Sequence, residues 1–159
     1  MSSLPNFFTL AQQVGESLPD QLTIVFMTAI GMLVAHALLI LLIGKIYQLL
    51  IDWADKRDIF WLSIPFYMIA VGLILMTHLV DIVVWSYALI ALKIFEIDTN
   101  AFYFAGEMYT TVGYGNFPLP DNWKILPIVV AFSGIFAASM SGAVLFNMIG
   151  QIIRKKTVK

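Results

Sequence analysis

The sequence predicts an all-α membrane protein with three transmembrane helices, a re-entrant helix and an extended segment between the second and third spans. Of its 159 residues, 60% are hydrophobic and 12% are charged, which is far from the composition of a soluble domain. Three apolar runs reach the roughly 20 residues that a helix needs to cross a hydrocarbon core. Helices are expected because backbone groups in lipid must be paired within their own segment, and the alternating pattern of a membrane barrel is absent. The chain has no cysteine, which excludes disulfides and thiolate metal sites.

The three apolar runs define the predicted spans. The first covers residues 22–44, with His36 as its only ionisable group. The second covers residues 62–92 and has Pro65 in its first turn, where a missing N–H does no harm. The third covers residues 125–150. The remaining segments are an amino-terminal tail (1–21), a connector (45–61) and a basic tail (151–159).

The lysines and arginines predict the orientation in the membrane. Of the nine, three lie in the connector and four in the basic tail. Because cytoplasmic loops near helix ends are enriched in these residues, we expect both segments inside and the amino terminus outside, in a multi-pass protein of the cell membrane. No basic leader precedes the first span, so a cleavable signal peptide is not expected. The connector is expected to lie on the inner membrane surface as an amphipathic helix, and residues 7–14 to form a short interfacial helix.

The segment between the second and third spans does not look like a simple loop. Residues 99–110 are mostly apolar and aromatic and make about three helical turns, too few to cross a bilayer. Asp98 and Thr99 offer oxygens for an N-cap, so a re-entrant helix is predicted. Residues 111–115 then read Thr-Val-Gly-Tyr-Gly, in which the two alternate glycines can adopt positive φ and let successive carbonyls face one line. Irregular backbone at membrane depth is tolerated only in protein or along a watery path, so this segment should line a pore.

Residues 62–150 contain, in order, a span, the re-entrant helix, Thr-Val-Gly-Tyr-Gly and a further span. In this order they resemble the pore domain of potassium channels. Loops of this sequence are the standard example of a selectivity filter whose backbone carbonyls replace the hydration shell of K⁺. The resemblance implies a passive, potassium-selective channel without an organic cofactor, K⁺ being the bound and transported ion. It implies that Thr111 gives the hydroxyl and carbonyl of the innermost site. Carbonyl rings above it would come from Val112, Gly113 and Tyr114, and Gly115 would close the outer mouth.

One filter segment cannot surround an ion, and the chain has no second Gly-Tyr-Gly. The resemblance therefore implies a homotetramer in the bilayer, with three identical partner subunits. The leading span departs from the minimal two-helix pattern and resembles a group of short bacterial single-pore channels. Two alternatives stay open, a non-selective or weakly selective cation channel and a membrane regulatory subunit that does not conduct. Metalloprotease, nucleophile-elbow and phosphate-loop motifs are absent, so we expect no enzyme, no nucleic-acid binding and no soluble ligand domain.

The residues around the filter are expected to support it. Many members of that family have Glu and Asp where this chain has Glu107 and Asn116, with an aromatic donor at the position of Tyr103. With Asn in place of Asp, Glu107 could bond the amide without sharing a proton, which suggests altered inactivation. The alternative is that Glu107 meets water or a backbone N–H. The predicted support set is Tyr103, Glu107, Thr110 and Asn116.

Two ionisable residues inside the second span share a helix face. His78 and Asp81 are three residues apart, and counting about 1.5 Å per residue places them in the outer half of the bilayer, level with the filter. They would either couple pH to the filter or hold the span to its neighbour by a structural hydrogen bond, and we favour the second because such contacts are common between spans. The same counting places His36 in the inner half, too low to reach His78, so a two-histidine metal site is not expected.

Small residues recur every four positions in the third span, at Gly134, Ala138 and Gly142. Such spacing permits close helix packing. Gly134 is also a candidate gating hinge, because glycine weakens a helix locally.

Overall fold

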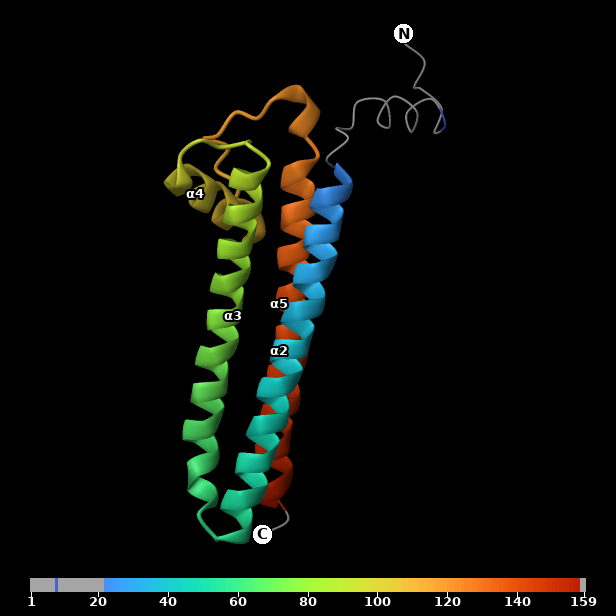
Figure 1. The fold of residues 1–159 in the computed structure, drawn as a ribbon. Coiled ribbons are helices and arrows are strands. Elements are labelled where there is room, and N and C mark those ends of the chain that lie inside the picture. Colours follow the sequence, from blue (N-terminus) through green and yellow to red (C-terminus); the bar gives the residue numbers. More distant parts are fainter. Residues whose placement is uncertain (1–7, 9–21, 158–159) are drawn as a thin grey trace.

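The computed structural model describes Phe8 and residues 22–157 (Figure 1). The described helices in chain order are α2 (Leu22–Lys56), η1 (Phe60–Leu62), α3 (Ser63–Ala91), α4 (Asp98–Tyr109), η2 (Asp121–Trp123) and α5 (Leu126–Thr157). Three of them, α2, α3 and α5, are long and apolar enough to cross a membrane. The described part contains no strand, so the predicted all-α membrane architecture is confirmed. The helix predicted around residues 7–14 lies outside the described residues, apart from Phe8.

The three long helices form a bundle, with α2 packed against both α3 and α5 (Figure 1). Helix α4 lies at one end of the bundle and packs against α3 and α5. The turn between α2 and α3 and the end of α5 lie together at the opposite end. The two segments that carry most of the basic residues are therefore at the same end of the molecule.

Helix α2 does not stop at Gly44 as predicted. It continues through the connector to Lys56, so the predicted surface helix is instead part of the first span. The reason is that Tyr47, Ile51 and Ala54 are buried on one face of this extension, and the first two join a core cluster with residues of α3 and α5. The helix ends where Asp58 takes φ 57°, and the Ile59 N–H donates to the Ala54 carbonyl at 3.0 Å. This is the helix-ending turn that glycine usually makes.

The start of α4 differs from the prediction in its capping residue. Ile97 is the N-cap residue and makes no side-chain cap bond, so the prediction that Asp98 or Thr99 caps the helix is wrong. Asp98 is the first residue of the helix, where its carboxylate lies near the positive end of the helix dipole.

The buried residues form two apolar clusters along the bundle. One joins the outer part of α2 to α4 and to Trp85 of α3. The other joins Ile40 of α2 to Ile74 of α3 and Met148 of α5. Between the two clusters, α2, α3 and α5 each place polar side chains in the interior, at His36, Asp81 and Ser141.

Candidate functional site: the filter segment and a buried polar cluster

The end of α4 passes directly into the filter segment, which we define as residues 111–115. Thr110 is the C-cap of α4, and its backbone N–H and side-chain hydroxyl both donate to the Gly106 carbonyl, at 3.0 and 2.6 Å. The Gly113 N–H donates to the Glu107 carbonyl at 3.1 Å. The filter segment is therefore tied back onto the last turn of the helix that precedes it.

The backbone of the filter segment alternates in the sign of φ. Thr111, Gly113 and Gly115 have φ of 62°, 56° and 72°, whereas Val112 and Tyr114 are not in the positive region. Alternation of this kind turns successive peptide planes so that their carbonyls are able to face the same side. The two glycines behave as the sequence predicted. Thr111 was not foreseen, because a β-branched residue at positive φ is a rare outlier, and such strained residues cluster at ligand sites.

The filter segment is open in the single chain. All five of its residues are exposed, including 54% of Val112 and 74% of Tyr114. Glycine carries no side chain, so Gly113 and Gly115 leave their backbone bare, and nothing would lie within 4 Å of a Cβ added to either.

Among the described residues, no side-chain hydrogen bond joins the predicted support residues to one another. The Glu107 Oε2 oxygen is buried and accepts no hydrogen bond from the described residues, and no bond between Glu107 and Asn116 is present within one chain. Tyr103 is 63% exposed and packs edge-on against Phe102. A buried carboxylate oxygen without a donor is costly, so Glu107 requires a donor that the described residues do not supply.

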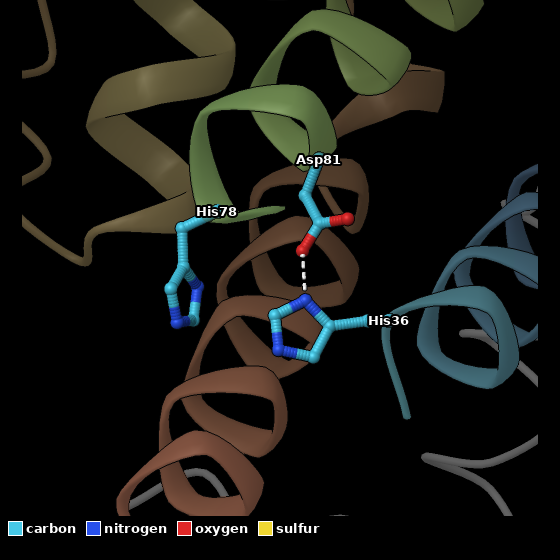
Figure 2. Close-up of side chains that lie close together, drawn as sticks. All are labelled: His36, His78 and Asp81. Carbon is cyan, nitrogen blue, oxygen red and sulfur yellow. Dashed lines mark hydrogen bonds and ion pairs between the residues drawn. The ribbon is translucent and has the colours of Figure 1, made fainter. Parts of the chain in front are cut away.

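His36 of α2 meets His78 and Asp81 of α3 in the middle of the bundle (Figure 2). His36 Nδ1 lies 2.7 Å from Asp81 Oδ2, and the two imidazole ring centroids are 4.7 Å apart. The prediction that His36 lies too low to reach His78 is wrong. It counted down from Leu22 and assumed that the helix ended at Gly44. When positions are counted from the turn that joins α2 to α3, the two histidines differ in height by only about 7 Å at 1.5 Å per residue. This difference is small enough for the two side chains to meet.

Two further residues close this cluster into a ring. Tyr109, the last residue of α4, donates its hydroxyl to Asp81 Oδ2 at 2.7 Å, and His78 Nδ1 lies 2.9 Å from the same hydroxyl. Ser141 of α5 lies with its Oγ 2.9 Å from His36 Nε2 and 3.1 Å from His78 Nε2. We call His36, His78, Asp81, Tyr109 and Ser141 the polar ring. The sequence pointed to His78 and Asp81 but missed Tyr109, which sits among aromatic residues, and Ser141, which looked like a small packing residue.

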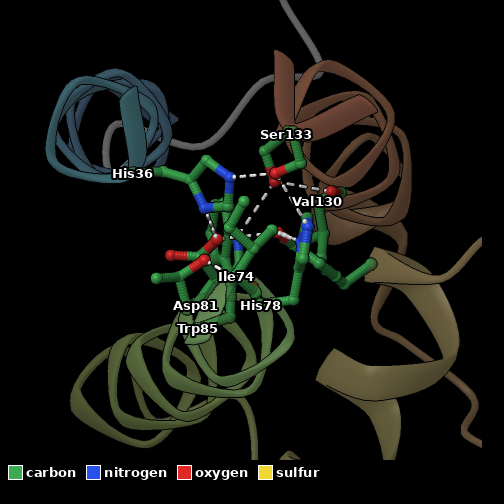
Figure 3. Close-up of polar contacts among 10 residues, drawn as sticks. His36, Ile74, His78, Asp81, Trp85, Val130 and Ser133 are labelled. Atoms are coloured by element: carbon green, nitrogen blue, oxygen red, sulfur yellow. Dashed lines mark hydrogen bonds and ion pairs between the residues drawn. The ribbon is translucent and has the colours of Figure 1, made fainter. Parts of the chain in front are cut away.

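A second polar contact joins α3 to α5 beside the ring (Figure 3). The Trp85 indole N–H donates to Ser133 Oγ at 3.0 Å, and the Ser133 hydroxyl donates to the Val130 carbonyl at 2.6 Å. Trp85 and Ser133 are almost fully buried. Together with the ring, this contact holds α3 to α5 on two levels.

Gly134 of α5 lies directly against the backbone at the end of α4. A Cβ added there would lie 1.9 Å from the Tyr109 carbonyl oxygen and 2.8 Å from its carbonyl carbon. Only glycine fits, so packing alone explains this residue, and the role of Gly134 as a hinge stays a prediction. By contrast, nothing would lie within 4 Å of a Cβ at Gly142.

Comparison with known proteins agrees with this geometry. Residues 74–151 match a family model described as an ion channel. No curated protein and no solved structure matches the chain. The matched residues include α4, the filter segment, most of α3 and most of α5, whereas α2 lies outside them. Residues 74–151 are therefore similar to an ion channel domain, in a protein with three helices that are long and apolar enough to span a membrane.

Proposed function

We propose that the chain is a subunit of a potassium-selective channel that conducts K⁺ passively through a fourfold filter of backbone carbonyls. The observation that carries the proposal is the alternation of φ along the filter segment, with positive values at residues 111, 113 and 115. It allows carbonyls from consecutive residues to face one axis, as replacing the water shell of an ion requires. K⁺ would bind at Thr111, Val112, Gly113 and Tyr114, with Gly115 at the outer mouth.

The electrostatics of α4 support a cation pathway. The carboxyl end of a helix carries a partial negative charge from its unpaired carbonyls, and the last turn of α4 has no basic residue to offset it. The filter segment follows directly from this end. A pathway of neutral carbonyl dipoles attracts cations without holding them so strongly that they cannot leave.

The exposure of the filter segment supports assembly as a homotetramer. One chain leaves Val112 and Tyr114 in the open, although filter backbone is stable at membrane depth only when protein surrounds it. Three further copies around an axis would enclose the segment, and the subunit contact or trapped water would supply the donor that Glu107 Oε2 lacks. The altered inactivation expected from Asn116 remains part of this proposal.

The orientation follows from the basic residues. The turn between α2 and α3 and the end of α5 lie at one end of the bundle (Figure 1). Lys56, Arg57 and Arg154 are at that end, so we place it in the cytoplasm and the filter toward the outside of the cell membrane.

Reconstitution into liposomes tests the proposal. The purified protein should pass K⁺ in preference to Na⁺, and Ba²⁺ should block the flux. Gly113→Ala should lose the preference, because alanine resists the φ of 56° that this position needs. The matched control is Gly72→Ala in α3, where nothing lies within 4 Å of the added Cβ. Equal K⁺ and Na⁺ flux in the wild type would indicate a non-selective channel, and assembled protein without flux would indicate a non-conducting subunit.

A further inference from the structure

We propose that the polar ring is a binding site for one proton, and that this proton attaches α2 to the end of the pore helix α4. The ring draws its side chains from four helices, with His36 from α2, His78 and Asp81 from α3, Tyr109 from α4 and Ser141 from α5. Apart from the Ser141 hydroxyl, α5 contributes no group to these contacts, so the titratable members are two histidines, one carboxyl and one phenol.

Counting hydrogens shows that the ring needs a proton beyond those of its neutral side chains and ionised carboxylate. The ring contains five hydrogen bonds, each of which requires one hydrogen. The tyrosine and serine hydroxyls supply one each, and each neutral imidazole supplies one, while an ionised carboxylate supplies none. That leaves one contact in which two lone pairs face each other. One added proton satisfies every bond and leaves the ring electrically neutral.

The proton is best placed on His36. With both nitrogens protonated, His36 donates to Asp81 Oδ2 and to Ser141 Oγ. Ser141 then donates to His78 Nε2, and His78 Nδ1–H donates to the Tyr109 hydroxyl oxygen. Tyr109 completes the circle by donating to Asp81. An imidazole is ordinarily the stronger base than a carboxylate by about 2.6 pH units, so the shared proton belongs to histidine.

Neither fewer nor more protons fit as well. Loss of the proton breaks one of the five bonds and leaves Asp81 as a lone charge among buried groups, which is costly. A second added proton would make both imidazoles cationic with ring centroids 4.7 Å apart and only one carboxylate to compensate. His78 is only half buried and is the member through which protons would exchange with solvent.

A metal ion is the competing occupant. One ligand atom from each of His36, His78 and Asp81 can be chosen so that all lie within 4.8 Å of one another. Tetrahedral Zn²⁺ bonds of about 2.0 to 2.1 Å would bring the ligand atoms to about 3.4 Å. Both nitrogens of each histidine already have protein partners at hydrogen-bond distance, so the geometry fits a proton better than a metal.

Histidine nitrogen NMR in lipid bilayers tests the proposal directly, because the chain has only two histidines. Isotope-labelled protein at neutral pH should show one imidazolium and one neutral imidazole, and the imidazolium signal should disappear as the pH is raised into the alkaline range. Two neutral or two charged histidines across this range would overturn the proposal. So would signals that shift on adding micromolar Zn²⁺ with one ion retained per chain, since these would assign the ring to a metal.

The Tyr109→Phe variant distinguishes the proposed hydrogen count from a simple ion pair between His36 and Asp81. The variant removes two of the five bonds and one hydroxyl hydrogen, so two neutral histidines and Ser141 satisfy the three bonds that remain. In the variant the hydrogen count no longer calls for the added proton, and only the charge of Asp81 still favours it, so the imidazolium should be lost at a lower pH than in the wild type. An imidazolium that is lost at the same pH in both proteins would contradict the count. The matched control is Tyr47→Phe, which removes a buried tyrosine hydroxyl bonded to the Met148 carbonyl at 3.4 Å outside the ring and should leave the imidazolium in place.

The effect on conduction rests on the proposed channel function and has its own measurement. Potassium flux from liposomes should change over the same pH range in which the imidazolium is lost, and Tyr47→Phe should keep this dependence. A flux that ignores pH while the imidazolium titrates would refute the coupling to the pore. Absence of flux at any pH would refute the channel proposal while leaving the NMR result to decide on the proton site.

Discussion

Tyr109 links two regions, because the filter segment begins two residues after it and its hydroxyl belongs to the polar ring. The two regions satisfy their polar groups in opposite ways. The filter segment exposes its backbone and leaves it to be enclosed by something outside the chain. The ring buries four of its five side chains, leaves His78 half buried, and pairs all five within one chain. The difference indicates which parts a subunit completes alone. Assembly would be required for the filter, whereas the ring should already exist in a single folded subunit.

The largest effect is expected where the two regions meet. Gly134→Ala would drive a Cβ into the Tyr109 carbonyl, at 1.9 Å, and backbone atoms cannot rotate out of the way as a flexible side chain can. We expect loss of both assembly and flux, measured by size-exclusion chromatography in detergent and by liposome assay. Gly142→Ala, with nothing within 4 Å, is the control. A Gly134→Ala protein that assembles normally and differs only in open probability would instead favour the hinge.

A smaller effect is expected inside the ring. Asp81→Ala leaves His36 Nδ1 buried without its acceptor, at a cost of about 1 to 3 kcal/mol, whereas the Tyr109 hydroxyl can turn to donate to His78 Nδ1. Thermal unfolding should occur at a clearly lower temperature, while the K⁺ over Na⁺ preference of the remaining folded protein should persist. Asp121→Ala is the control, because its ion pair with Lys124 lies on the surface with both side chains largely exposed. Loss of selectivity in Asp81→Ala would show that the filter and the ring are not separate.

The smallest effect is expected at the contact beside the ring. Trp85→Phe removes the bond to Ser133, which still donates to the Val130 carbonyl and is not left without a partner. The lost bond should cost about 0.5 to 1.5 kcal/mol, in addition to some packing area. Trp61→Phe, at a residue 70% exposed, should change the unfolding temperature much less. Equal effects of the two substitutions would mean that the Trp85 contact adds nothing to the bundle.

The sequence predicted what depends on neighbours along the chain. The three spans follow from apolar length, and the positive φ at Gly113 and Gly115 follows from the residue type. The unforeseen features depend on tertiary contacts. The extension of α2 to Lys56 reflects burial of Tyr47 against other helices, and no property of threonine alone predicts a φ of 62° at Thr111.

The polar ring was missed for a related reason. Heights in a membrane were counted from the apparent ends of apolar runs, and an error in one end displaced His36 by several turns. A hydroxyl residue among small or aromatic neighbours also gives no local sign that it will meet a carboxylate from another helix. Such contacts come from packing, so Tyr109 and Ser141 could be recognised only in three dimensions.

The close pairing of α2 and α5 bears on how a pore of this kind would open. At the end of the bundle far from α4, Gly44 allows Val144 to within 3.4 Å of the position of its missing Cβ, and the Tyr47 hydroxyl reaches the Met148 carbonyl. In the proposed channel, any outward movement of α5 at this end must therefore carry α2 with it or slide along it, so α2 would add to the resistance against opening.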